Sequence, residues 1–259
     1  MFADRAEVSP ATVAASWAAP PEDLRLGGRD VHVWKASLDV GPLRVGRFAE
    51  ILSEDERARA LRFVFAVDRD RFIICRGVLR ALLGRYLRVA PDSLRFTYNA
   101  YGKPVLSTGR GREAYRFNVS HAGGMALYGV TIGREVGIDV ERVRPDVVTD
   151  QIAEQCFSRR ELAAFRGLSP AGRVEGFFRG WTRKEAYVKA RGEGFVYPLG
   201  EFDVSLGPTE PAALLSTPRD PLETSRWSLE EVLGGPNYIA AIAVEGRGWR
   251  LRRWQWTDS

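Results

Sequence analysis

One order of elements occurs twice along this chain, and the repetition is what most restricts the folds open to it. In each half a strand is followed by a short helix, a long helix with an apolar face, and further strands. Both short helices begin with a capping box, in which a serine and a glutamate three residues later satisfy free N–H groups. The boxes run from Ser53 to Glu56 and from Ser158 to Glu161. We therefore predict an α+β fold of two similar halves, although the same order also occurs in α+β proteins without a repeat.

Hydrophobic periodicity supplies the expected helices and strands. The long helices are expected over Asp68–Leu87 and from about Arg173 to Arg191, where apolar residues recur at helical spacing. Strands are expected where apolar residues alternate or form short runs between turn residues. They are Val31–Leu38, Phe117–Val119, Ala126–Ile132, Val136–Val143, Phe202–Leu206, Tyr238–Val244 and Trp249–Trp256.

Composition along the chain suggests where the halves begin and end. Residues 1–28, rich in Ala, Pro and Gly, are expected to form an N-terminal arm. Residues 29–133 and 134–259 are the two predicted halves. Residues 207–236, rich in Pro, Gly, Ser and Thr, are expected to be an inserted loop region of the second half.

The overall composition is that of a soluble globular protein. No apolar stretch is long enough to span a membrane, and the N-terminus lacks the basic segment and apolar run of a secretory signal. Cys75 and Cys156 are the two cysteines, which excludes a disulfide scaffold and a cysteine-rich zinc site. We therefore expect a cytoplasmic protein without a membrane segment.

The charge pattern favours an anionic partner but not nucleic acid. The net charge is +5, yet the arginines are scattered, with no basic arm and no nucleic-acid motif. The chain has 34 arginines and four lysines, and three of the lysines (Lys103, Lys184 and Lys189) fall in two short segments described below. In a chain that uses arginine by default, a lysine marks a position that requires a compact charge.

The segment Gly137-Ile-Asp-Val-Glu141 brings two carboxylates together. On a strand, Asp139 and Glu141 point to one face, while Ile138 and Val140 point to the other. Neighbouring buried carboxylates repel each other unless a cation lies between them, and Mg²⁺ prefers such oxygen ligands. A metal site is one interpretation; a strand edge with its acids in solvent is the other.

The helix around Trp181-Thr-Arg-Lys-Glu185 carries a glutamate and a lysine on one face. Glu185 and Lys189 are four residues apart, as in a surface ion pair. Much of the helix circumference is apolar, however, so the pair is expected to line a cleft rather than a solvent-exposed face. Gly192 and Gly194 suit the turn that ends the helix.

Two further segments carry polar groups at turns. Phe117-Asn-Val-Ser-His121 places Ser120 and His121 at a strand end, where a satisfied loop histidine is the alternative. Tyr101-Gly-Lys-Pro104 is a tight turn that presents Lys103 beside a rigid proline, and such a turn can offer groups to a phosphate or a base.

These four segments, in this order and spacing, resemble the Sfp-type 4′-phosphopantetheinyl transferases. That family shows Gly-Lys-Pro, Phe-Asn-x-Ser-His, Gly-Ile-Asp-x-Glu and Trp-x-x-Lys-Glu-Ala-x-x-Lys before Gly-x-Gly, and all occur here. The resemblance extends from about residue 30 to residue 205, and Ala186 places the chain in the Lys-Glu-Ala subgroup. It implies two α+β halves related by pseudo-twofold symmetry, with the active site in the cleft between them.

The resemblance also implies a reaction and its catalytic groups. Family members transfer the 4′-phosphopantetheine of coenzyme A to a serine of an apo carrier protein, with Mg²⁺, and release adenosine 3′,5′-bisphosphate. By position, Asp139, Glu141 and Glu185 resemble the metal ligands, and Mn²⁺ is also possible. Lys189 would contact the pyrophosphate, and either Glu185 or Glu141 would accept the serine proton, directly or through water.

The resemblance further implies how coenzyme A and its partner bind. The partner would be an acyl or peptidyl carrier protein, acidic around its serine, and the transferase would act as a monomer. The alternatives are a non-catalytic protein that binds coenzyme A or a carrier, and a nucleic-acid-binding protein. The residues expected to contact coenzyme A are Arg59, Arg71, Lys103, Pro104, Ser120, His121 and Lys189.

Overall fold

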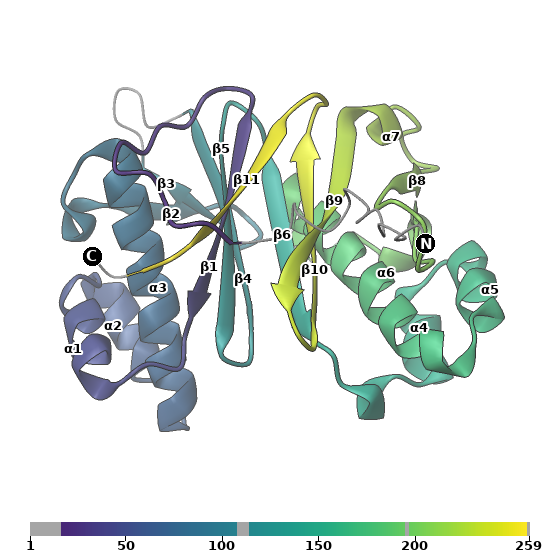
Figure 1. Ribbon diagram of the computed structural model, residues 1–259, viewed down its shortest axis with the longest axis horizontal. Helices are drawn as coiled ribbons and strands as arrows, with labels where there is room; N and C mark the ends of the chain where they lie inside the picture. The colour runs from purple at the N-terminus through teal and green to yellow at the C-terminus, as the bar shows by residue number, and fades with distance from the viewer. Residues whose placement is uncertain (1–16, 108–113, 195–196, 258–259) are drawn as a thin grey trace, which may run out of the picture.

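The computed structural model describes residues 17–107, 114–194 and 197–257 of the chain. Two sheets lie side by side in the middle of the molecule, and helices cover their outer flanks (Figure 1). One helical layer contains α1 to α3 and the other α4 to α6. The predicted mixed fold of helices and strands is confirmed.

The first half contains a four-stranded sheet in the order β11-β1-β5-β4. A small hairpin of β2 and β3 precedes β4. The elements of this half are β1 (Asp30–Ser37), α1 (Pro42–Glu50), α2 (Glu54–Ala60), α3 (Ala66–Leu87), β2 (Phe96–Tyr98), β3 (Pro104–Leu106), β4 (Tyr115–Ala122) and β5 (Met125–Ile132).

The second half repeats this arrangement with a three-stranded sheet in the order β6-β10-β9. In both sheets, the first of three strands along the chain pairs with the third, and the third pairs with the second: β1-β5-β4 and β6-β10-β9. The expected repeat is therefore visible in the topology. The elements are β6 (Val136–Arg142), α4 (Asp150–Cys156), α5 (Arg159–Gly167), α6 (Pro170–Arg191), β7 (Asp203–Val204), β8 (Leu214–Ser216), α7 (Glu223–Arg226), β9 (Trp227–Gly235), β10 (Tyr238–Glu245) and β11 (Arg250–Gln255).

Each capping-box glutamate also anchors the long helix that follows it. Both boxes form as expected, at the starts of α2 and α5. Arg80 and Lys184 are each the fifteenth residue of a 22-residue helix, α3 and α6. Arg80 lies 2.5 Å from Glu56, and Lys184 lies 2.7 Å from Glu161, with all four side chains buried. The same buried ion pair therefore fixes the short helix to the long one in both halves.

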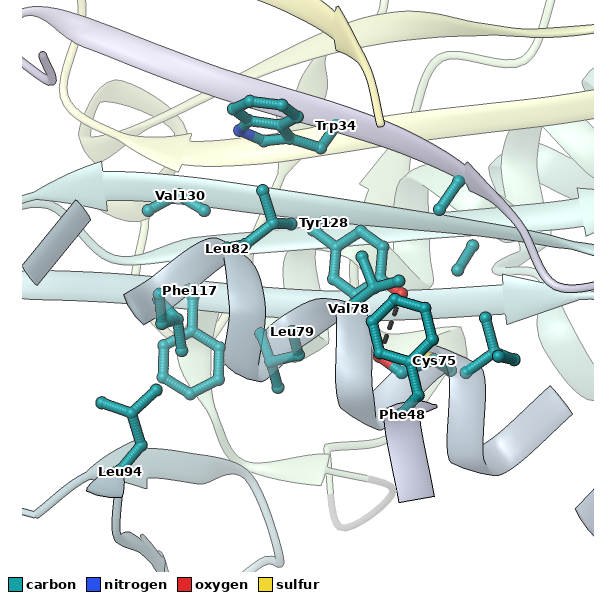
Figure 2. Close-up of a cluster of buried hydrophobic side chains, with 14 of the residues drawn as sticks. Trp34, Phe48, Cys75, Val78, Leu79, Leu82, Leu94, Phe117, Tyr128 and Val130 are labelled. Atoms are coloured by element: carbon teal, nitrogen blue, oxygen red, sulfur yellow. Dashed lines mark hydrogen bonds between the residues drawn. The ribbon is translucent and has the colours of Figure 1, made fainter. Parts of the chain in front are cut away.

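The core of the first half lies between α3 and its sheet. Figure 2 shows Val78, Leu79 and Leu82 of α3 packed toward Trp34 of β1 and Tyr128 of β5. The Tyr128 hydroxyl donates to the carbonyl of Cys75 at 3.0 Å, so this buried polar group is satisfied. Both cysteines are buried and free, in agreement with the absence of a disulfide scaffold.

A second polar contact in this core involves a buried histidine. The Tyr86 hydroxyl accepts a hydrogen bond from Trp34 Nε1 at 2.8 Å and lies 2.7 Å from His32 Nδ1. Burial lowers the pKa of His32 to about 4, and the charge of Arg252 acts in the same direction against the opposing effect of Asp30. His32 is therefore neutral in the folded protein at neutral pH.

Two strands differ from the sequence expectations. Residues 207–236 were expected as a loop region, but they contain β8, α7 and the nine-residue β9. Trp227, Leu229 and Val232 of β9 are buried, and the polar residues between them conceal the strand in the sequence. The last strand, β11, was expected in the second half, yet it pairs in parallel with β1 of the first.

The N-terminal arm is described only in part. Most of the predicted N-terminal arm (residues 1–16) lies outside the described residues. Within the described part, Ala18 bridges to Trp254. A search of the described helices finds none long and apolar enough to cross a membrane.

The buried His32 predicts a pH-dependent stability. The unfolded chain binds a proton near pH 6.5 and the folded chain near pH 4, so the free energy of unfolding falls as the pH is lowered through this window. Between pH 7 and pH 5 we expect a loss of about 2 kcal/mol from this group. Urea unfolding at pH 7 and pH 5 gives the change in the free energy of unfolding for wild type and for His32→Gln, and this change should be smaller in the variant. An equal change in both proteins would contradict the prediction.

Candidate active site

The candidate site lies where β4 of the first half runs beside β6 of the second. Side chains of β4 make this junction. Asn118 Oδ1 accepts a hydrogen bond from the N–H of Ile138 at 2.9 Å, and Ser120 Oγ accepts one from the N–H of Val140 at 3.3 Å. The contacts advance in the same direction along both strands, as in the parallel pair of β1 and β11. The two half-sheets are thus held together through side chains.

The long helix α6 approaches this junction closely because β6 carries a glycine. A Cβ atom at Gly137 would lie 2.1 Å from the carbonyl oxygen of Ala186 and 2.3 Å from the backbone nitrogen of Ala190. No larger residue fits without moving the helix. The glycine therefore allows side chains of α6 to reach the acids of β6.

Ser120, Asp139 and Lys189 form a hydrogen-bonded cluster across three elements. Ser120 Oγ donates to Asp139 Oδ1 at 2.8 Å, and Lys189 Nζ lies 3.0 Å from Ser120 Oγ and 2.5 Å from Asp139 Oδ1. The Asp139 side chain is 4% exposed and that of Lys189 29% exposed. The lysine therefore neutralises a buried carboxylate while its side chain remains accessible to solvent.

Two more carboxylates adjoin this cluster. Glu141 Oε1 accepts a hydrogen bond from Trp181 Nε1 at 3.3 Å, and burial together with the charge of Asp139 raises the pKa of Glu141. Burial raises the pKa of Glu185 to about 7; Asp139 and Glu141 act in the same direction, and Lys189 opposes them. The three predicted metal ligands thus lie close enough to influence one another.

The donor atoms suit a hard cation, although they do not form a complete ligand set as they lie. Asp139 Oδ2 and Glu185 Oε1 are buried and have no hydrogen-bond partner among the described residues. Within those residues, no group of three or more His, Cys, Asp and Glu side chains is close enough to hold a metal ion. Unpartnered buried carboxylate oxygens are costly, and a bound cation would offset that cost.

Arg71 and His121 lie at one edge of this region. Arg71 makes two hydrogen bonds to Asp39, at 2.8 and 3.2 Å, beside an open cavity of about 490 Å³. His121 reaches solvent near the end of β4. Surrounding protein atoms and the charges of Lys189 and Arg71 lower its pKa. The three side chains therefore share one electrostatic environment.

Arg59 lies apart from this group. It is exposed on α2, and its guanidinium lies 5.4 Å from the centre of the Phe72 ring. It lines a separate hollow of about 170 Å³ together with Arg62 and Phe63. The structure thus brings Arg71, but not Arg59, into electrostatic contact with His121.

The lysine of the Gly-Lys-Pro turn has a structural role. Lys103 Nζ donates to Glu135 Oε2 at 3.1 Å, to the carbonyl of Val136 at 3.3 Å and to that of Ala190 at 3.2 Å. Its side chain is 11% exposed. Lys103 therefore ties the turn to β6 and to the end of α6, while Pro104 lines an adjoining hollow of about 170 Å³.

Sequence reasoning missed two residues that position the site. Asn118 belongs to the Phe117–His121 segment, in which only Ser120 and His121 were predicted to have functional roles. Gly137 preceded the paired acids without being given a function. The signal for Asn118 is its amide, two residues before Ser120 and on the same strand face. The signal for Gly137 is a glycine between two β-branched residues, Val136 and Ile138, inside a strand.

Comparison with known proteins identifies the family. Residues 135–243 match the 4′-phosphopantetheinyl transferase superfamily, and residues 43–131 match the N-terminal part of a 4′-phosphopantetheinyl transferase. The chain is 39% identical to the 4′-phosphopantetheinyl transferase HetI of Nostoc sp., over 93% of this chain and 98% of that protein.

More distant relatives agree. A putative 4′-phosphopantetheinyl transferase of Synechocystis sp. is 34% identical over 82% of this chain and 86% of its own length. Sfp of Bacillus subtilis is 27% identical over 62% of this chain and 69% of its own length. The protein is thus an enzyme that transfers a phosphorus-containing group. It belongs to the 4′-phosphopantetheinyl transferase family.

Because Glu185 has a buried oxygen without a hydrogen bond among the described residues, we expect its charge to lower the free energy of unfolding. Glu185→Gln removes a buried charge next to two other acids without changing the side-chain shape. In metal-free buffer at pH 8, we expect its free energy of unfolding to equal that of wild type or exceed it by about 1 kcal/mol. Urea unfolding with EDTA measures this, with Glu154→Gln on the surface as control. A loss of more than about 1 kcal/mol would mean that the charge supports the fold.

Proposed function

We propose that this enzyme transfers the 4′-phosphopantetheine group of coenzyme A to a serine of an apo acyl or peptidyl carrier protein. The serine oxygen forms a bond to the β-phosphorus, and the bond from that phosphorus to the bridging oxygen breaks. Adenosine 3′,5′-bisphosphate leaves. The observation that carries the proposal is the group of three acids and a lysine at the junction of the two halves, in a chain of this family.

The acids are proposed to hold a divalent cation. Asp139, Glu141 and Glu185 would be its ligands, and the two unpartnered buried oxygens support this assignment. When bound, Mg²⁺ or Mn²⁺ supplies positive charge to the pyrophosphate, where negative charge accumulates during transfer. The lysine side chain stands beside the same acids, and a bound cation would release it from Asp139.

Lys189 is proposed to stabilise the departing bisphosphate. Its ammonium group lies on Asp139 and Ser120, and its side chain is partly exposed. A flexible, compact cation there can transfer its hydrogen bonds to a phosphate oxygen with little movement. Ser120 would then bind the same phosphate, since its hydroxyl already joins both groups.

Glu185 is favoured over Glu141 as the group that accepts the serine proton. Its Oε1 atom is buried and has no hydrogen bond among the described residues, so it can accept a proton. Glu141 Oε1 already accepts from Trp181. The transfer can be direct or through water.

The remaining contacts with coenzyme A are assigned by position. Arg71 and His121 are proposed to bind the phosphates of its adenosine end, and Arg59 stays a further candidate from its position in the sequence alone. The Lys103–Pro104 turn is proposed to hold the base, Pro104 by contact and Lys103 by keeping the turn in place. The basic chain suits an acidic carrier protein, and one chain that contains both halves suits a cytoplasmic monomer.

Mass spectrometry of the carrier tests the proposal. Purified enzyme is mixed with coenzyme A, an apo carrier protein and Mg²⁺, with EDTA in a parallel sample. We expect the carrier to gain one phosphopantetheine, and the gain to disappear with EDTA. Glu185→Ala should reduce the rate by at least about 100-fold while circular dichroism stays unchanged, because a metal ligand and base is lost.

Glu154→Ala, on the surface, is the matched control and should retain full activity. Retained transfer in Glu185→Ala would contradict the metal assignment. No transfer to several unrelated carriers, with coenzyme A still bound, would instead favour a protein that binds coenzyme A without reaction.

A further inference from the structure

The first half has its own counterpart of the candidate site. α3 and α6 have equal length, and Ala81 and Arg85 occupy the positions in α3 that Glu185 and Lys189 occupy in α6. β11 runs in parallel beside β1, as β4 runs beside β6. By this correspondence, the space between β1, the end of β11 and α3 is the first-half equivalent of the site between β6, β4 and α6.

Next to the end of β11, a cavity of about 490 Å³ opens between α1, α3 and Trp256, and both Ala81 and Arg85 line it. Phe48, Ile51, Ala81 and Trp256 are among its apolar lining residues. Trp256 follows β11 directly, and its backbone N–H donates to the carbonyl of Lys35 at 2.8 Å, so the ring is held beside β1. A cavity of this size accommodates a small organic molecule.

Among the described residues, the charged side chains that line the cavity are four arginines: Arg44, Arg47, Arg85 and Arg88. The Arg85 guanidinium lies 5.9 Å from the Trp34 ring centre and 6.0 Å from that of Trp256. Arg88 makes an exposed contact of 3.5 Å with Asp23. Among the described acids, none lies within ion-pair distance of Arg47 or Arg85. Among the described residues, Arg47 and Arg85 are therefore cations without an acid partner beside an apolar floor.

We propose that this cavity is a second ligand site, which binds a phosphate monoester with an apolar body. The guanidinium groups of Arg47 and Arg85 match a phosphate in geometry and charge. Two such charges favour a dianion over a singly charged carboxylate. The apolar floor favours an organic group over inorganic phosphate. Ala81 stands where the candidate active site has an acid, so this site binds the anion without a divalent cation.

Isothermal titration calorimetry with phenyl phosphate, in EDTA at pH 8, tests the proposal. Wild type and Lys189→Met, in which the candidate active site is altered, should bind the probe equally at the cavity. Arg85→Met should weaken this binding at least tenfold, and Ala81→Phe should do the same by filling the floor while keeping every charge. Arg160→Met, an exposed arginine elsewhere, is the matched control and should bind as wild type does.

The phosphate part and the aromatic part of the probe are also titrated separately. Inorganic phosphate and benzyl alcohol should both bind at least tenfold more weakly than phenyl phosphate. Absence of binding, or binding that Arg85→Met and Ala81→Phe leave unchanged, would overturn the proposal. Loss of binding in Lys189→Met alone would place the probe in the candidate active site and would overturn it too. The modification of the carrier is measured in a separate assay. A failure of the second ligand site can therefore be told apart from a failure of the proposed transfer.

Discussion

The arrangement of this enzyme depends on how two half-sheets meet. Asn118 and Ser120 of β4 accept hydrogen bonds from the backbone of β6. Ser120 also bonds Asp139 and Lys189, so the residue that joins the halves is part of the candidate site. A shift of one half against the other would therefore alter the spacing of acid, lysine and serine. The site exists only where both halves are in place.

The two halves share an arrangement of helices and strands but differ in chemistry. The buried pairs Glu56–Arg80 and Glu161–Lys184 are equivalent in position and hold each short helix against its long helix. One residue further along the long helices, the chemistry differs, because Glu185 in α6 corresponds to Ala81 in α3. The shared ion pairs thus hold the helices together in both halves, whereas the cluster of Asp139, Glu141 and Glu185 belongs to the second half.

Local patterns predicted the fold where structure is local. Capping boxes and helical periodicity located α2, α3, α5 and α6, because those signals depend on residues a few positions apart. β11 could not be assigned to the first half from sequence, since its partner β1 lies more than 200 residues away. The spacing of Asp139 and Glu141 predicted that both belong to one acidic site. That Lys103 would be bonded to Glu135 and two carbonyls depends on the tertiary fold, which the sequence pattern does not encode.

The central claim is that Asp139, Glu141 and Glu185 form one cation site at the junction of the halves. Anomalous diffraction from a crystal grown with Mn²⁺ and coenzyme A tests it directly. The account predicts a single strong peak bounded by carboxylate oxygens of these residues, with the Lys189 ammonium displaced from Asp139 toward the pyrophosphate. A peak elsewhere, or none while Lys189 remains on Asp139, would contradict the claim.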